Sequence, residues 1–361
     1  SVYDDAGGEG GRRADPDLRP ARPDEGGRPY PDGDPVPLDR AMSPSRCFQG
    51  VLDGWDSWCR LYRSVEAFGP LVRDILRREG LPFSGPVSAA GPGTNAVFRA
   101  GTQGELVVKI FAPPESGLDS PEDYAVERYG LERASLAGIP APALYARGVR
   151  EDRYRFAYLV MAFQPGEEAG VALRGMAPEA KRAFARRLQG LTDRLGALPL
   201  EGEMAALLRR RAAKNRSPEN RRWARLPAPL EAARAAWLLA HPPAEEAYVH
   251  GDLCGDNLLL TPEGELVLLD FADAVAAPRC YDYPPILVDL FALDPVLTRA
   301  FRGGCPPERF ADDCLTGLFL HEFGQELLES ACRRLLPGGV EDLAGPAPFA
   351  PLWEAVCRLA S

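Results

Sequence analysis

Lysine is scarce in this sequence. Of the 42 basic residues only three are lysine, namely Lys109, Lys181 and Lys214, and the rest are arginine. A chain that almost never uses lysine nevertheless places one inside the apolar segment LVVKIF, residues 106–111. Because an ammonium group is rarely buried unless it has a partner, Lys109 is a candidate functional residue.

Histidine is also rare, and the cysteines are not spaced as metal ligands. The chain has three histidines and eight cysteines, and no two cysteines form a CxxC pair. The ligand spacing of a structural zinc site is therefore missing. We expect the cysteines to be reduced, as in a cytosolic protein.

Long apolar runs and excess positive charge are absent as well. No apolar run reaches about 18 residues, so we expect no transmembrane helix and no membrane partner. The first residues, SVYDDAGGEGG, have neither the basic nor the apolar part of a secretory signal, so we expect a cytoplasmic protein. The net charge of −10 argues against a nucleic-acid partner, because neutralising phosphates requires a basic surface.

The length and the order of the segments predict two parts and a tail. At about 150 residues per domain, 361 residues make two domains or one bilobal unit. Residues 1–45 are rich in Gly, Pro, Asp and Arg, and we predict a disordered tail. Residues 46–165 are predicted to form N-terminal helices and a small, sheet-rich lobe, and residues 166–361 a larger, mainly helical lobe. This order favours an α+β fold with a small antiparallel sheet.

Hydrophobic periodicity and turn residues predict the elements. A helical pattern runs from Cys47 to about Gly80. The turn 101–104 joins two strands into a hairpin. The predicted strands are 96–100, 105–112, 139–151, 154–163, 257–260 and 266–271. The other predicted helices are 121–137, 178–195, 201–215 and 229–241, with more helix from about residue 285.

The segment YVHGDLCGDNLLLTPEGELVLLDFADA, residues 248–274, carries the strongest chemical pattern. Four residues separate Asp252 from Asn257, and Asp270 follows at the end of an apolar strand. Phosphoryl transfer from a nucleotide needs a carboxylate for the acceptor hydroxyl and hard oxygen ligands for Mg²⁺. Singly, these residues could be a turn residue, a cap and a strand-end carboxylate, but their order favours a kinase-type site.

HGDLCGDN followed by LLDFADA resembles the aminoglycoside phosphotransferase and choline kinase family of protein-kinase-like enzymes. The resemblance covers roughly residues 68–295. It implies a bilobal protein-kinase-like fold, Mg²⁺, and transfer of a γ-phosphoryl group to a small-molecule hydroxyl. It also implies that Asp252 is the catalytic base and that Asn257 and Asp270 are metal ligands. His250 and Asp282 would support the catalytic loop.

In this fold a lysine on a central strand of the small lobe reaches the α and β phosphates of the nucleotide, and Lys109 matches it. The alternative is a lysine on the solvent face of an edge strand. Two carboxylates on the following predicted helix, Glu127 and Glu132, could pair with it. Glu127 lies thirteen residues before Pro140, as in the family, and is preferred.

Two further segments are candidates for the nucleotide site. GPGTNAVFRA, residues 91–100, precedes Lys109 as a phosphate-covering loop would, and Gly93, Thr94 and Asn95 could meet phosphate; an ordinary turn is the alternative. YLVMAFQPG, residues 158–166, resembles the family's hinge. There the backbone meets the nucleotide base, and the lining residues would be Met161, Ala162 and Phe163. Core packing of these side chains is the alternative, and the choice between ATP and GTP stays open.

The acceptor is not fixed by the sequence. Residues 208–227 are strongly basic, which would suit an anionic acceptor, and the C-terminal helices are acidic, which would suit an aminoglycoside or amino sugar. The acidic residues are Asp289, Asp294, Asp312, Asp313, Glu322, Glu326 and Glu329. An aminoglycoside acceptor would imply antibiotic resistance, and another amino sugar or alcohol would imply metabolism. A catalytically silent, nucleotide-binding regulatory module is the alternative function. The sequence does not indicate an oligomeric state.

Overall fold

The computed structural model describes most of the chain. The predicted tail, residues 1–45, lies outside the described residues, as does Pro92 of the predicted phosphate-covering loop. The described residues are 46–81, 84–91, 93–217, 220–242 and 245–361.

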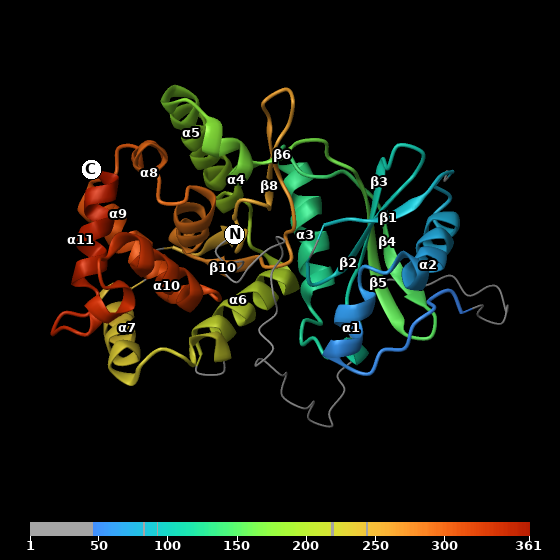
Figure 1. Cartoon of the computed structure of the whole chain (residues 1–361), viewed down its shortest axis with the longest axis horizontal. Helices are drawn as coiled ribbons and strands as arrows, with labels where there is room; N and C mark the ends of the chain where they lie inside the picture. The colour runs from blue at the N-terminus through green and yellow to red at the C-terminus, as the bar shows by residue number, and fades with distance from the viewer. Residues whose placement is uncertain (1–45, 82–83, 92, 218–219, 243–244) are drawn as a thin grey trace. The chain divides into compact units, whose positions relative to one another are not determined.

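The described chain forms two compact units (Figure 1). The smaller unit comprises residues 46–128 and 143–163, and the larger unit comprises residues 129–142 and 164–361. Helix α3 (Asp123–Leu136) contributes residues to both units. Each unit is described below by itself.

The smaller unit is built on one antiparallel sheet with strand order β1-β2-β3-β5-β4. The strands are β1 (Val87–Ala89), β2 (Ala96–Ala100), β3 (Leu106–Ile110), β4 (Leu144–Glu151) and β5 (Arg155–Ala162). The predicted hairpin of β2 and β3 is present, and its turn has left-handed backbone at Gly101 (φ 109°) and Gly104 (φ 67°), which glycine adopts readily.

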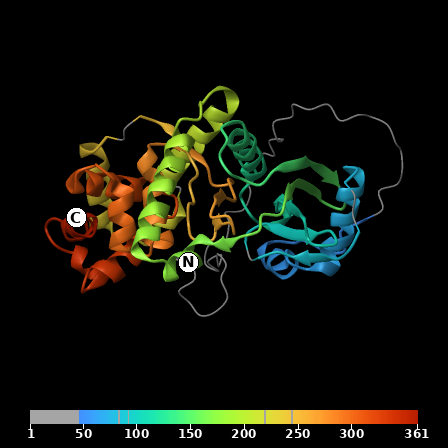
Figure 2. The same cartoon turned by 90° about the horizontal axis from the view of Figure 1, so that it is seen from above.

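Two helices, α1 (Trp55–Leu61) and α2 (Val65–Arg78), cover one face of this sheet (Figures 1 and 2). Phe68 of α2 packs against Phe98 of β2, with ring centroids 5.5 Å apart. Because side chains alternate across a strand, Val108 and Ile110 of β3 join this core and Lys109 between them is on the opposite face.

The predicted helix from Cys47 is wrong over its first part. No helix is present over residues 46–54, and the chain folds back onto the sheet core there. Phe48 fills that core against Phe68 and Phe156, at 4.7 and 5.2 Å between ring centroids. The helical break lies at Tyr62–Ser64, where the Ser64 side chain caps α2 by accepting from Ala67 N.

The larger unit is mainly helical. Its helices are α4 (Ala169–Ala172), α5 (Pro178–Gly196), α6 (Gly202–Arg216), α7 (Ala228–Ala240), α8 (Pro295–Arg302), α9 (Pro307–Leu320), α10 (Gly324–Leu335) and α11 (Ala350–Ala360). Its strands are β6 (Glu167–Glu168), β7 (Ala247–Val249), β8 (Leu258–Leu260), β9 (Leu266–Leu268) and β10 (Val275–Ala277). Two small antiparallel sheets result, β10-β7 and β6-β8-β9.

The predicted α+β class, a small antiparallel sheet followed by a mainly helical region, is confirmed. Helix α6 packs on β10, where Ala212 joins Val249, Val275 and Tyr281 in one apolar cluster. No helix in the described ranges is long and apolar enough to cross a bilayer. All eight cysteines are free thiols.

Candidate active site

The loop between β7 and β8 carries Asp252 and Asn257. Asp252 is fully buried, with an exposed fraction of 0%. The side-chain nitrogen of Asn257 donates to the Asp252 carboxylate at 2.8 Å and to the Asp252 carbonyl at 3.0 Å. Both partners only accept hydrogen bonds, so the amide nitrogen of Asn257 must face them. Asn257 thereby fixes the orientation of the Asp252 carboxylate.

His250 has a defined tautomer in this loop. Its Nδ1 accepts from the backbone N–H of Asp252 at 3.3 Å, so the ring proton is on Nε2, which donates to the carbonyl of Leu269 at 2.9 Å. Its ring also packs on Phe271, 4.9 Å between centroids. These contacts occupy both ring nitrogens, which supports a positioning role for His250 rather than a role as a base.

Asp282, which follows strand β10, supports the same loop. Its carboxylate accepts from the backbone N–H of Gly251 at 2.8 Å and of His250 at 3.1 Å. Gly251 has φ 85°, and a Cβ there would lie 2.0 Å from the carbonyl oxygen of Asp273. Only glycine allows that approach. Burial raises the pKa of Asp282 to about 6, although the two N–H groups oppose the rise.

This raised pKa makes stability depend on pH. The folded protein binds a proton at Asp282 that an unfolded aspartate, with its ordinary pKa of about 4, has lost. Stability therefore falls as the pH rises from about 4 to about 6, by about 3 kcal/mol from this group. We expect Asp282→Asn to remove this dependence of stability on pH. The substitution should therefore destabilise the protein more at pH 4 than at pH 7. Urea unfolding at both pH values tests this, and equal destabilisation would contradict it.

Strand pairing brings Asp270 to the same loop. Strands β8 and β9 pair with Leu258 opposite Leu268, and Leu269 N donates to the carbonyl of Asn257 at 2.9 Å. Asp270 follows directly, and its backbone is left-handed, with φ 53°. A non-glycine residue keeps this conformation only where its surroundings impose it, and such residues cluster at functional sites.

The two residues predicted as metal ligands fit a hard divalent cation. Because the Asn257 nitrogen faces Asp252, its amide oxygen is directed away from that carboxylate. Together with the Asp270 carboxylate it offers oxygen ligands only, the donor type that Mg²⁺ prefers. These residues would hold the cation of a nucleotide complex.

In the smaller unit, Lys109 is on the middle strand of the sheet, not on an edge strand. Its Nζ lies 2.6 Å from Glu127 Oε2, and the two side chains are 6% and 2% exposed. Glu127, the preferred of the two predicted carboxylates, therefore contacts Lys109. A buried lysine held by a buried glutamate has a fixed position, as an ammonium that must meet phosphate requires.

Three residues before β2 were predicted to contact phosphate, namely Gly93, Thr94 and Asn95, and their surroundings differ. Among the described atoms, a Cβ on Gly93 would meet nothing within 4 Å, so packing does not require glycine there. The Thr94 carbonyl accepts from Trp58 Nε1 at 2.9 Å. Asn95 is 6% exposed, and its side-chain oxygen accepts from Ala112 N at 3.1 Å, which ties the start of β2 to the end of β3. Phosphate contacts by these residues stay a prediction.

The predicted hinge residues end strand β5. Met161 is 6% exposed, and Ala162 and Phe163 are half-buried. The N–H of Ala162 donates to Ala143 O and that of Phe163 to Glu105 O, each at 2.9 Å. These two N–H groups already form hydrogen bonds within the smaller unit. The groups with which the segment could contact a nucleotide base are therefore its carbonyls and side chains. Its role also stays a prediction.

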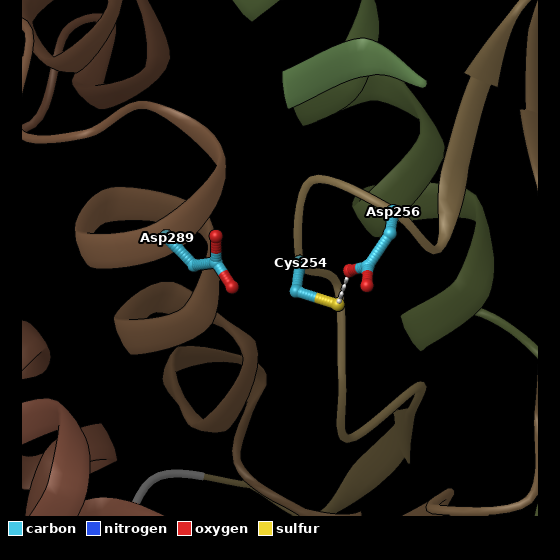
Figure 3. Close-up of side chains that lie close together, drawn as sticks. All are labelled: Cys254, Asp256 and Asp289. Atoms are coloured by element: carbon cyan, nitrogen blue, oxygen red, sulfur yellow. Dashed lines mark hydrogen bonds between the residues drawn. The ribbon is translucent and has the colours of Figure 1, made fainter. Parts of the chain in front are cut away.

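An acidic cluster adjoins the catalytic loop. Cys254 Sγ donates to Asp256 Oδ1 at 2.9 Å, and Asp289 of the π-helical turn Pro285–Leu290 directs its carboxylate toward this pair (Figure 3). The ligand atoms of the three residues all lie within 4.8 Å of one another. Partial burial and the nearby charge of Asp256 raise the pKa of Glu168. We call Asp256, Asp289 and Glu168 the acidic cluster.

Some residues of the other charged stretches noted in the sequence form ion pairs. Arg222 lies 3.4 Å from Glu322, and Arg225 lies 3.6 Å from Glu329. Lys181 contacts Asp294 at 2.6 Å. The basic stretch 208–227 is thus partly neutralised by acidic residues of the C-terminal part.

Comparison with known proteins establishes the family. A family model described as the phosphotransferase enzyme family matches residues 88–314, more than half of the 361-residue chain. The chain belongs to this family. The resemblance expected from HGDLCGDN and LLDFADA is confirmed, and so is a phosphotransferase as the class of enzyme. No curated protein sequence matches the chain.

Solved structures share the fold of this phosphotransferase. The GDP and kanamycin complex of APH(2")-IIia is 18% identical over 80% of this chain and 97% of that chain, with a TM-score of 0.52. The streptomycin–ATP complex of APH(2")-IIa is 12% identical over 69% and 87%, with a TM-score of 0.50. An apo thermostable mutant of APH(4)-Ia is 16% identical over 79% and 98%, with a TM-score of 0.50.

Two residues near the loop of Asp252 were not singled out in the sequence. Arg211 of α6 donates from Nη2 to the Ala272 carbonyl at 2.7 Å, and Glu168 belongs to the acidic cluster. Asp289 was among the acidic residues expected to suit an aminoglycoside, but its place beside Cys254 and Asp256 was not predicted. Each of the three lies on an element far along the chain from the HGDLCGDN motif. The basic run around Arg211 was a signal, but it does not tell which arginine faces the site.

Proposed function

We propose that this phosphotransferase transfers the γ-phosphoryl group of ATP or GTP, bound with Mg²⁺, to a hydroxyl group of an amine-bearing small molecule. An aminoglycoside, another amino sugar or an amino alcohol fits this description. The observation that carries the proposal is the buried Asp252 carboxylate, oriented by Asn257, with Asp270 following the paired strand β9. The similar structures include complexes of GDP with kanamycin and of ATP with streptomycin. They support a nucleotide as the donor and an amine-bearing molecule as the acceptor.

The residues divide the chemistry between them. The acceptor oxygen bonds to the γ-phosphorus, the bond from that phosphorus to the β–γ bridging oxygen breaks, and the hydroxyl proton passes to the Asp252 carboxylate. Lys109, held by Glu127, neutralises phosphate charge. Asn257 and Asp270 would hold Mg²⁺, which supplies charge stabilisation to the polyphosphate. Positioning and charge stabilisation dominate such transfers, so Asp252 mainly orients the hydroxyl.

The direct test is a nucleotide-consumption assay. Aminoglycosides, amino sugars, nucleosides and polyols are offered with ATP or GTP, and products are identified by mass as singly phosphorylated. We expect turnover with amine-bearing acceptors. Nucleotide binding without turnover on any acceptor would instead favour the silent regulatory module.

The acidic cluster gives a prediction about the acceptor. We expect Asp289→Asn to raise KM for an amine-bearing acceptor about tenfold, because a charge-assisted hydrogen bond to an ammonium is lost. The KM for the nucleotide should not change. Glu341→Gln, which removes one exposed carboxylate elsewhere in the larger unit, is the control. An unchanged KM in Asp289→Asn would exclude the cluster from acceptor binding.

A further inference from the structure

The segment after strand β9, residues 270–273, begins with a residue in a backbone conformation that is uncommon outside glycine. Asp270 is left-handed at φ 53°, and its Oδ1 accepts from Ala272 N at 3.3 Å. An aspartate tolerates this conformation better than a branched residue, but surrounding contacts must still maintain it.

Besides the packing of Phe271 on His250, two described contacts lie just beyond Asp270. The carbonyl of Asp273 lies against Gly251, where a Cβ would be only 2.0 Å away. The carbonyl of Ala272 accepts from Arg211 Nη2 at 2.7 Å. The first is a close packing contact with the catalytic loop, and the second is a charge-assisted hydrogen bond from helix α6, the stronger kind.

Packing and a hydrogen bond fix helix α6, which carries the donor of the hydrogen bond to Ala272. Ala212, next to Arg211, is buried in the apolar cluster with Val249 and Val275, the residues at the facing ends of β7 and β10. One turn further, Asn215 donates to the Tyr281 hydroxyl at 3.0 Å, beside Asp282. The helix that holds Ala272 is therefore fixed to strands β7 and β10 and to Tyr281.

We propose that Arg211 is a positioning residue: its hydrogen bond to Ala272 holds residues 270–273 in the conformation that directs the Asp270 carboxylate to the cation of the bound nucleotide. This rests on the proposed function, because it assigns Asp270 to that cation. Arg211 itself touches neither the nucleotide nor the acceptor in this role. Its loss should weaken cation binding and kcat while the acceptor KM stays the same.

The test measures cation binding directly, with Mn²⁺ as the probe. Free Mn²⁺ is followed by electron paramagnetic resonance in the presence of a non-hydrolysable ATP analogue. We expect Arg211→Met to weaken Mn²⁺ binding about tenfold, the scale of one lost charge-assisted hydrogen bond. Arg211→Lys, which keeps the charge and a donor, should be intermediate. Arg216→Met removes an exposed arginine from the same helix and should bind as wild type does.

The outcomes separate this inference from the proposed function. If Arg211→Met does not fold, Arg211→Lys decides the matter. Wild-type affinity for Mn²⁺ in the folded variant, whichever it is, would overturn the role of Arg211 alone. Failure of the wild-type protein to bind Mn²⁺ with the nucleotide analogue would overturn the proposed function and this inference with it. If the wild-type protein binds Mn²⁺ with the nucleotide analogue but phosphorylates no acceptor, the role of Arg211 in cation binding stands. Only the proposed catalytic step is then overturned.

Discussion

Asp252→Asn is expected to lower kcat about a thousandfold or more while nucleotide binding persists. The asparagine side chain can still accept the hydrogen bond that Asn257 donates at 2.8 Å, so the loop should keep its shape. What it loses is the negative charge that receives the hydroxyl proton and orients the acceptor. The measurements are kcat with the best acceptor and the dissociation constant of ATP or GTP by calorimetry.

Glu263→Gln is the matched control for this variant. Glu263 is exposed in the turn between β8 and β9, and its replacement also removes one carboxylate from the same part of the chain. Its kcat should equal that of the wild-type protein. Phosphorylation by Asp252→Asn at the wild-type rate would show that another group acts as the base. Loss of both turnover and nucleotide binding would show that the variant disturbs the loop as a whole.

Helices and hairpin strands could be predicted from the sequence, whereas short strands that pair across a long stretch of chain could not. The helix predicted over 201–215 is α6, Gly202–Arg216. Strands β8 and β9 have only three residues each, but the turn between them marks the predicted strand pair 257–260 and 266–271. Strands β7 and β10 are equally short and pair across more than twenty residues of chain, so no turn marks them and only their pairing in the fold defines them.

The error at residues 47–54 has a related cause. Phe48 and Leu52 are apolar because they fill the core beneath the five-stranded sheet, in a segment with no helix. Their spacing imitates one face of a helix. Gly54, with φ 131°, ends this segment just before α1, a conformation that argues against a continuous helix. Tertiary packing thus produced a pattern that local periodicity misassigns.

The candidate site was predictable where the sequence itself brings residues together. Asp252 and Asn257 share one loop, and a hairpin returns the chain to Asp270, so their proximity follows from local structure. Asp289 approaches this loop, and Arg211 contacts Ala272 just beyond Asp270, from helical segments on either side of residues 248–274 in the sequence. Their approach depends on how α6 and the turn 285–290 pack, which spacing along the chain does not encode.

Lys109→Met is expected to have the largest effect on stability. It would leave the Glu127 carboxylate, 2% exposed, without the ammonium now 2.6 Å away. Removing one partner of a buried ion pair costs about 3–5 kcal/mol. Urea unfolding measures this cost, and Lys214→Met, at an exposed lysine of α6, should change stability by less than about 1 kcal/mol. An unchanged unfolding free energy in Lys109→Met would show that the pair contributes nothing to folding.

A double variant separates stability from nucleotide binding. In Lys109→Met with Glu127→Gln, no charge is left buried at the pair, so most of the lost stability should return, because an apolar and a neutral side chain avoid the desolvation cost of two ions. Nucleotide binding should stay weakened at least about tenfold, since no ammonium is left to meet the phosphates. Restored binding in the double variant would mean that Lys109 serves only the fold, and that another group in the chain neutralises the nucleotide.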